Sequence, residues 1–308
     1  FVRANRSAPV SARIAHHPIV FEGLKKITGK NYIEKTIIKA IKNDIAIFAI
    51  HTNLDNVLDG VNGMMAKALG LNNVQILAPK KEILNKLITY VPNDHLELVK
   101  TALFQAGAGK LGNYDECSFS TQGEGTFRAL VGSNPYVGEQ NSQHKEQETR
   151  LEVIYPSYLE ASILAALKKH HPYEEVAYDC IELKNTSNEI GAGIIGMLEK
   201  PIFLIDFLKQ VKSTFNAGSL KYTSPTKDLV QKIAYCGGSG SFLLGAAKAN
   251  QADIYITADY KYHEFFDAED KIVIADIGHY ESEQFTPEII HSFLQKKFSN
   301  FALYFTQV

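Results

Sequence analysis

Two spacings of hydrophobic residues alternate along the first third of the chain and predict alternating strands and helices. Residues 31–43 place isoleucines at helical spacing with lysines between them, which indicates an amphipathic helix. Residues 45–50 (IAIFAI) are apolar without interruption, a pattern typical of a buried strand in a parallel sheet. A short strand over 11–15 and a helix over 57–69, ended by Gly70, complete this region.

The composition of the chain changes between residues 107 and 148, which are rich in glycine and small polar residues. We place a domain boundary near Thr121. From Arg150 the order is strand, helix, strand, strand, helix, which is typical of ferredoxin-like domains and of PII-type signalling proteins; the GAGIIG segment is assigned to a loop. Strand–helix alternation resumes near Leu229. We therefore predict an α/β core of residues 1–122 and 229–308, with a PII-like domain of residues 123–228 inserted.

Length and composition fit this organisation. The chain has 308 residues, of which 45% are hydrophobic, enough for about two domains with cores of their own. A net charge of −2 gives no electrostatic case for a nucleic-acid partner, and no apolar run is long enough to span a membrane. The three widely spaced cysteines predict neither a disulfide framework nor a zinc ribbon, and we expect a reducing, cytoplasmic setting with buried, apolar cysteines.

Polar residues able to bind metal follow the carboxyl ends of three predicted strands. They are His16 and His17, then Asp55, and finally His279 with Glu283. In an open α/β sheet, loops from neighbouring strands converge at this edge and form sites. The sequence therefore predicts that these five side chains lie together at one sheet edge.

The chemistry of the five residues favours two divalent ions. Adjacent residues of an extended chain point in opposite directions, so His16 and His17 would each face a different ion. Asp55 can bridge two cations, and His279 and Glu283 share one helical face. These ligands leave coordination positions open for water or substrate, as a hydrolytic site requires, and they suit Zn, Mn, Fe or Ni without distinguishing among them.

Each piece also has a plainer interpretation. A His pair before proline is often a turn, Asp55 could be the N-cap of a helix starting near Asn56, and a His and a Glu four residues apart are often an exposed ion pair. The joint placement of the residues favours the metal site. His51 and Asn53 could form a second shell around Asp55 or only loop hydrogen bonds. Residues 237–241 (GGSGS) fit a tight turn better than a phosphate loop.

Seven segments, in order, carry a resemblance that runs from His16 to Phe305. The segments are HHPIVF, HTNLDN, GAGKLGNYDECSF, HPYEEVAYD, CGGSGS, TADYKYHEFFDA and DIGHYESE. They resemble the Nif-three-like dinuclear metal-centre proteins, often labelled GTP cyclohydrolase I type 2 homologues.

The resemblance implies a toroidal homohexamer of α/β subunits with a PII-like insert. The family's ligands fall on His16, His17, Asp55, His279 and Glu283, and His263 resembles a near-site histidine that could orient a ligand or move a proton, although a helix-surface histidine fits it as well. The family normally has a further strand and helix before the HHP segment, and the start FVRANRSAPVSAR differs from it. We therefore expect the N-terminal part of the core to be missing.

Two functions remain open at this stage. The first is a metal-dependent hydrolase acting on a nucleotide-like substrate such as GTP, with His263 or Glu283 assisting proton transfer as the catalytic candidates. The alternative is a non-enzymatic, metal-binding regulatory or scaffold ring whose insert binds an effector or a partner.

Overall fold

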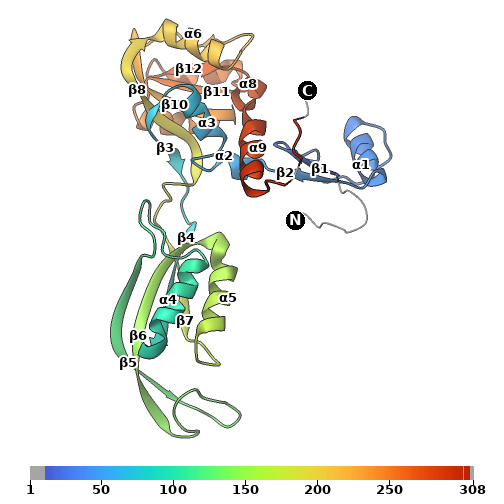
Figure 1. Ribbon diagram of the computed structural model, residues 1–308. Helices are drawn as coiled ribbons and strands as arrows, with labels where there is room; N and C mark the ends of the chain where they lie inside the picture. The colour runs from blue at the N-terminus through green and yellow to red at the C-terminus, as the bar shows by residue number, and fades with distance from the viewer. Residues whose placement is uncertain (1–10, 301, 306–308) are drawn as a thin grey trace. The chain divides into compact units, whose positions relative to one another are not determined.

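The computed structural model describes residues 11–300 and 302–305, and Figure 1 shows its helices and strands. Contacts divide the chain into two compact units: the first contains Phe1–Ala78 and Ile190–Val308, and the second contains Pro79–Glu189. The second unit therefore interrupts the sequence of the first. No helix in the described part of the chain is long and apolar enough to cross a membrane.

A six-stranded sheet forms the centre of the first unit, with the strand order β3-β8-β10-β11-β12-β9. Its strands are β3 (Asn72–Pro79), β8 (Gly191–Phe203), β9 (Lys221–Tyr222), β10 (Leu229–Ser239), β11 (Ile254–Ala258) and β12 (Val273–Asp276). Strands β10, β11 and β12 run parallel, whereas β8 is antiparallel to β10 and β9 to β12. All of β11 is buried, as expected for a central strand of a sheet covered on both faces.

Helices cover both faces of this sheet. On one face, α3 (Val61–Ala68) and α6 (Leu204–Thr214) pack against strand residues such as Ile256. On the other face, α7 (Leu244–Ala249) and the 3₁₀ helix η4 (Tyr262–Ala268) contribute to a second apolar cluster. The other helices that follow the strands are η3 (Ser241–Leu243), α8 (His279–Glu283) and α9 (Thr286–Lys297).

A separate two-stranded sheet holds the first elements of the chain. Strands β1 (Ser11–Ala15) and β2 (Ile45–Ala49) pair in parallel, and α1 (Tyr32–Lys42) lies between them in sequence. The helix starts as predicted, because the side chain of Asn31 accepts the backbone N–H of Glu34 and caps it. The predicted burial of β2 is wrong: Phe48 is 51% exposed among the described residues. This sheet is not part of the six-stranded sheet, so its strands are not covered as central strands are.

The second unit is an antiparallel four-stranded sheet with two helices. The strand order is β5-β6-β4-β7, and the elements are β4 (Leu84–Pro92), η1 (Asn93–His95), α4 (Leu96–Gln105), β5 (Ser118–Arg128), β6 (Gln143–Pro156), η2 (Ser157–Leu159), α5 (Glu160–His170) and β7 (Tyr178–Leu183). Helices α4 and α5 pack together on the sheet, where Leu103 and Ile163 join Leu87 and Leu151 in one buried cluster. The opposite sheet face carries Tyr90 and Arg150, which alternate with these core residues along β4 and β6.

The two units divide the chain at other places than the sequence predicts. Thr121, the predicted boundary, lies inside β5, and the polar stretch around it belongs to the long β5–β6 hairpin. Residues 79–122 thus fall in the second unit, and residues 190–228 fall in the first. The GAGIIG segment is not a loop but the start of β8, where Ile194 and Ile195 are buried. Polar strands such as β5 and glycine-containing strands such as β8 have the sequence composition of loops, which explains why the predicted boundary and the predicted loop were misplaced.

The helix predicted over residues 57–69 is shorter than expected. A separate turn, α2 (Thr52–Asp55), precedes it, and α3 begins only after Gly60. A Cβ on Gly60 would lie 1.8 Å from the carbonyl oxygen of Leu54, so the two helices approach closely at this glycine. Gly70 adopts a positive φ of 69° directly after the C-cap Leu69, as predicted for a residue that ends a helix.

Candidate metal centre

His16 and His17 directly follow β1, and both rings turn toward the same carboxylate. The Nε2 atom of His16 lies 3.5 Å from Oε2 of Glu283 and 3.4 Å from Oδ1 of Asp55. The Nε2 atom of His17 lies 3.3 Å from the same Oε2 of Glu283. The two residues sit in a bend rather than in extended chain. Adjacent histidines therefore converge on one oxygen here, although their other neighbours differ.

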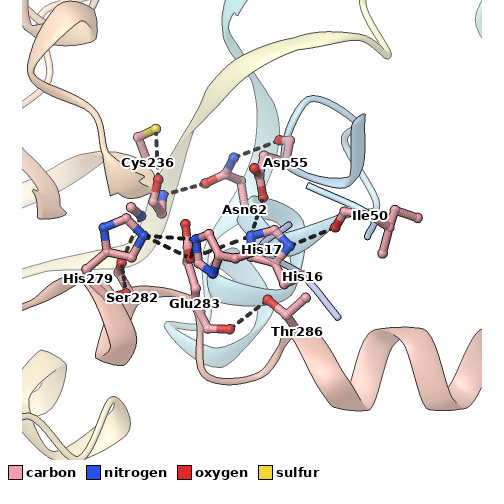
Figure 2. A network of polar contacts seen from close by, with 12 residues as sticks. His16, His17, Ile50, Asp55, Asn62, Cys236, His279, Ser282, Glu283 and Thr286 are labelled. Atoms are coloured by element: carbon pink, nitrogen blue, oxygen red, sulfur yellow. Dashed lines mark hydrogen bonds and ion pairs between the residues drawn. The ribbon is translucent and has the colours of Figure 1, made fainter. Parts of the chain in front are cut away.

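His279 and Glu283 come from the opposite end of the chain, on α8. They are four residues apart, and Nε2 of His279 lies 3.3 Å from Oε2 of Glu283, so the predicted shared helical face is confirmed. The same Nε2 lies 3.2 Å from Nε2 of His17. Figure 2 shows how these rings surround the carboxylate of Glu283. The predicted residues thus come together, but from the ends of strands in two separate sheets rather than from one sheet edge.

Hydrogen bonds on the far side of two rings fix which nitrogen faces the cluster. Nδ1 of His16 lies 2.9 Å from the carbonyl oxygen of Ile50, and Nδ1 of His279 lies 2.7 Å from Oδ2 of Asp259. A carbonyl oxygen only accepts, so Nδ1 of His16 donates, and in the neutral ring its Nε2 carries a lone pair. Carboxylates and carbonyls hold metal-binding histidines in this same tautomer.

Asp259 is a residue that the sequence interpretation missed. It directly follows β11, and its φ of 59° places it in the left-handed region, which aspartate tolerates better than most residues. Its position after an apolar strand matches the rule that identified the other candidates. The signal was therefore present in the sequence, in the segment TADYKYHE.

Three buried polar atoms of the cluster have no hydrogen-bond donor among the described residues. They are Nε2 of His16, Oδ1 of Asp55 and Oε2 of Glu283, and Glu283 is only 8% exposed. Burying such atoms without a partner is costly, whereas a cation placed among them would satisfy all three at once. Ligand atoms within 4.8 Å of one another form three groups: His16, Asp55 and Glu283; His17, His279 and Glu283; His16, His17 and His51. The donor set therefore fits a metal ion.

Burial and mutual charge set the protonation of the cluster. Burial raises the pKa of Asp55 to about 6. Burial also lowers the pKa of His17 and of His51 below the usual value for histidine. For His16, burial lowers the pKa, but the Glu283 and Asp55 carboxylates outweigh it, and the net shift is upward.

On α8, as for His16, neighbouring charges outweigh burial. Burial raises the pKa of Glu283, but the neighbouring histidines outweigh it, so the pKa lies below its usual value. Burial lowers the pKa of His279, and the Asp259 carboxylate outweighs it, so the net shift is upward. The carboxylate of Glu283, which contacts His16, His17 and His279, is therefore held in its ionised form.

The GGSGS segment packs against the carboxylate of Glu283, and two of its N–H groups bond to protein atoms rather than being left for a phosphate. The backbone N–H of Gly237 donates to Oδ1 of Asn62, and that of Gly238 donates to Oγ of Ser282, both at 2.8 Å. A Cβ on Gly238 would lie 2.4 Å from Oε1 of Glu283. These two N–H groups are thus already used, and Gly238 leaves the space that the carboxylate occupies.

Other predicted residues are placed less uniformly. The ring centroid of His51 lies 5.2 Å from that of His16 and 4.9 Å from that of His17, so it joins the cluster. Asn53 is exposed and forms no hydrogen bond with Asp55 among the described residues; instead Asn62, which is buried, donates to the Asp55 carbonyl oxygen. His263 is exposed on η4, and no hydrogen bond or ion pair within the described chain joins it to the cluster.

The cysteines take no part in the cluster as ligands. Cys236 is buried, and burial raises its pKa to about 12. Cys117 is half-buried, whereas Cys180 is exposed. The expectation that all three are buried is therefore wrong.

Fold and site together define a mixed α/β protein whose histidines and carboxylates converge in groups able to hold a metal ion. The chain belongs to the Duf34/NIF3 (NGG1p interacting factor 3) family, which matches residues 4–308. A Halalkalibacterium halodurans protein named GTP cyclohydrolase 1 type 2 homolog is 40% identical over 268 residues, covering 86% of this chain and 72% of that protein. The Bacillus subtilis protein of the same name is 39% identical over 269 residues, covering 87% and 72%. The family resemblance seen in the motifs is thereby confirmed.

Solved structures agree with this assignment. A Bacillus cereus protein related to NIF3 superimposes with a TM-score of 0.81 at 39% identity, covering 94% of this chain and 78% of that one. The Staphylococcus aureus protein SA1388 superimposes with a TM-score of 0.69 at 30% identity, covering 94% and 76%. The α/β fold of the chain is therefore the fold of NIF3-related proteins.

Proposed function

We propose that the chain holds a dinuclear metal centre and acts as a metal-dependent hydrolase on a nucleotide-like substrate. The ligands would be His16, His17, Asp55, His279 and Glu283. The supporting observation is the set of three buried atoms without donors, because they belong to groups that meet at Oε2 of Glu283. A carboxylate shared by two groups of ligands suits a pair of ions, with the shared oxygen on Glu283 rather than on Asp55 as the sequence suggested. Imidazole and carboxylate ligands suit Zn, Mn, Fe or Ni.

The donor set leaves room for chemistry. Divalent ions bound there would supply Lewis acidity, polarising a phosphoryl or amide-like group and lowering the pKa of water. His51 and Asp259 would serve as a second shell: Asp259 orients His279, and His51 lies beside both adjacent histidines. The nucleotide substrate is proposed from the name GTP cyclohydrolase 1 type 2 homolog that the relatives bear.

Proton transfer would fall to Glu283 or to His263. Glu283 lies inside the cluster and contacts three histidines. If Glu283 transferred the proton, it would have to do so while also serving as a metal ligand. His263 is exposed and free to meet a substrate approaching from solvent. If a His263→Gln variant keeps metal binding but loses turnover, the proton-transfer role belongs to His263.

The test is turnover of a nucleotide panel by protein loaded in turn with Zn, Mn, Fe(II) or Ni. We expect metal-dependent hydrolysis that falls by at least about 100-fold in the Asp55→Ala, His279→Ala double variant. Asp59→Ala is the matched control, because Asp59 is exposed and forms an ion pair with Lys67 at 3.9 Å, away from the five candidate ligands. Equal turnover in the wild type and the double variant would refute the hydrolase. Anomalous scattering that located two ions roughly 3.5 to 4 Å apart would support the dinuclear centre.

The second candidate is a non-enzymatic, metal-binding regulatory protein. The observation that favours it is a cavity of about 780 Å³ that lies wholly within the second unit. In this case no metal would give turnover, yet the melting temperature would rise with metal concentration by mass action. Thermal shift and turnover measured on the same preparations separate the two candidates.

We further propose that the second unit is a ferredoxin-like, PII-like domain and that the chain forms a homohexamer. The element order β4-α4-β5-β6-α5-β7, with the sheet order β5-β6-β4-β7, supports the first point. The exposed apolar residues of β2, such as Ile47 and Phe48, support a covering partner chain. Light scattering should give a mass six times that of the chain, and a monomer would overturn the hexamer.

A further inference from the structure

The second unit contains a cavity of about 780 Å³ on the sheet face that α4 and α5 leave open. Strand β5, the loop after it and the loop before β7 line the cavity, together with Tyr90 and Arg150 from β4 and β6. Its volume lies in the range of small-molecule sites, which are roughly 300–1,000 Å³. The cavity contains none of the residues of the candidate metal centre, so an inference about it does not rest on the proposed hydrolase.

A buried carboxylate lines this cavity. Glu148 is 9% exposed, and its Oε1 accepts a hydrogen bond of 2.8 Å from the hydroxyl of Tyr173. Its Oε2 accepts none among the described residues and faces Gly125, where a Cβ would lie 2.1 Å away. The glycine therefore makes room for an oxygen that keeps access to solvent and accepts no hydrogen bond from the described residues. A carboxylate oxygen at the cavity wall that is left open in this way favours a ligand that brings its own N–H donors and positive charge.

Aromatic rings surround the same space. The ring centroid of Tyr173 lies 6.1 Å from that of Phe127 and 6.2 Å from that of Tyr136, and all three residues line the cavity. The rings are tilted to one another rather than stacked. Aromatic faces attract organic cations, and the attraction grows when water is excluded. The rings and the buried carboxylate therefore favour the same class of ligand.

The charges along the wall agree with this. Four carboxylates line the cavity, on Glu124, Glu148, Glu174 and Glu175, against the guanidinium groups of Arg128 and Arg150. Both arginines are exposed, and so are Glu124, Glu174 and Glu175. Arg150 is paired at 3.0 Å with Glu152, and Glu124 at 2.8 Å with Lys145. Among the charged residues of the described lining, only Glu148 is buried, and its charge is negative.

We propose that this cavity binds a small organic cation, an amine or guanidinium compound, between Glu148 and the aromatic rings of Phe127, Tyr136 and Tyr173. The carboxylate accepts the N–H donors of the cation, and the ring faces contact its alkyl and charged parts. Such a site makes the second unit a sensor or carrier of amines.

The experiment uses the full chain and probes of equal carbon number. Putrescine carries two ammonium groups, 1,4-butanediol is neutral and succinate is an anion, so the series separates charge from size. Calorimetry should show saturable binding of putrescine, weakened by salt, with no saturable binding of the other two. Agmatine, which carries a guanidinium group, should bind at the same site and compete with putrescine.

Variants assign the binding to the residues. Glu148→Gln keeps an acceptor for Tyr173 but removes the charge, and it should weaken putrescine binding by roughly 10- to 100-fold. The matched control is Glu182→Gln on β7, at the opposite edge of the sheet, which should bind as the wild type does. Circular dichroism of each variant establishes that it folds.

A surface position supplies a second measurement that does not depend on the buried carboxylate. The chain has no tryptophan, so Tyr136→Trp introduces a single tryptophan at the cavity wall, whose emission can be excited apart from that of the tyrosines, and indole is the best cation–π face. Its fluorescence should change on putrescine addition with equal or higher affinity, whereas Tyr136→Leu should bind more weakly. The proposal is overturned if no cation binds saturably, if butanediol or succinate binds as tightly as putrescine, or if Glu148→Gln and Tyr136→Leu bind putrescine as the wild type does.

Discussion

Asp259 decides the orientation of one ring in the candidate metal centre. Its carboxylate accepts from Nδ1 of His279 and so directs Nε2 toward Glu283 and His17. The backbone holds it in the left-handed region, where an aspartate is uncommon and glycine or asparagine is easier to place. A residue kept in such a conformation and bonded to a candidate ligand is expected to matter for that ligand's affinity.

We therefore predict that Asp259→Asn weakens metal binding by about 10- to 100-fold while the fold is kept. Asparagine tolerates the same backbone conformation and can still accept from His279, but it lacks the charge that makes the imidazole a better ligand. Calorimetric titration with Zn or Mn measures the effect. Asp270→Asn is the matched control, since Asp270 is exposed and also has a positive φ, of 51°. Equal affinities in both variants would contradict the prediction.

Gly238 matters because it has no side chain, which leaves room for the carboxylate of Glu283. Its φ is 63°, and a Cβ would lie 2.4 Å from Oε1 of Glu283 and 3.3 Å from Cε1 of His279. Gly238→Ala should therefore lower the free energy of unfolding by roughly 2 kcal/mol or more and weaken metal binding.

The matched substitution is Gly245→Ala on α7. A Cβ there meets nothing within 4 Å, and Gly245 lies in a helix, so stability should stay equal or rise by about 0.4–1 kcal/mol. Chemical denaturation of the two variants beside the wild type gives both values. A Gly238→Ala protein as stable as the wild type would show that Glu283 is free to move aside.

The candidate ligands illustrate what the sequence could predict at this scale. Residues after apolar strands are recognisable from pattern alone, and His16, His279 and Glu283 are brought together as that rule expects. The same rule reaches Asp259, but aspartates after strands are common and a single one carries little weight. Asn62 gave no signal, because it lies inside a helix and acts through the backbone of Gly237 and Asp55.

At the scale of elements, His171 joins the end of α5 to β4. Its Nε2 lies 2.9 Å from the carbonyl oxygen of Tyr90, and its Nδ1 accepts the backbone N–H of Tyr173 at 3.1 Å. A carbonyl can only accept and an N–H can only donate, so the ring is held neutral with its proton on Nε2. Burial lowers the pKa of His171, which agrees with this arrangement.

The consequence is a loss of stability in acid. Because the folded pKa lies below the unfolded value of about 6.5, the unfolded chain binds the proton first, and stability falls as the pH drops through about 6.5 toward the folded pKa. The stabilisation is complete above that range. We predict that unfolding free energy falls between pH 7.5 and 5.5 by about 1 kcal/mol more in the wild type than in His171→Gln. Urea denaturation at both pH values measures this, and parallel curves for the two proteins would exclude it.

Elements with one clear hydrophobic period could be predicted, whereas those without it could not. Helix α1 and strands β1 and β2 lie where the pattern places them. The β5–β6 hairpin is polar because much of it is exposed, so its sequence resembles a linker. Strand β8 begins with glycines, which usually indicate a loop, yet its isoleucines enter the core. Burial of β2 could not be judged, because an apolar run does not say which surface covers it.

At the scale of the molecule, the chain consists of one unit interrupted by another. The second unit has a buried cluster of its own, formed by β4, β6, α4 and α5. Its ends are adjacent, since the backbone N–H of Ser187 donates to the carbonyl oxygen of Lys80 at 3.1 Å. A domain whose ends meet can be inserted into a loop of another at small entropic cost, because joining two ends that already lie together restricts little chain.

We predict that residues 79–189, produced alone, fold cooperatively, and that the remaining chain binds metal when a short Gly/Ser linker replaces them. The excised unit retains its whole apolar cluster and the hydrogen bond between its ends, so no buried surface of that cluster is newly exposed. The linker restores the connection between β3 and β8 without touching any of the five candidate ligands. Thermal unfolding followed by circular dichroism tests the first fragment, and metal titration tests the second. A fragment of residues 79–189 without a cooperative transition would mean that its cluster needs the rest of the chain, and loss of metal binding in the shortened chain would place part of the metal centre's stability in the second unit.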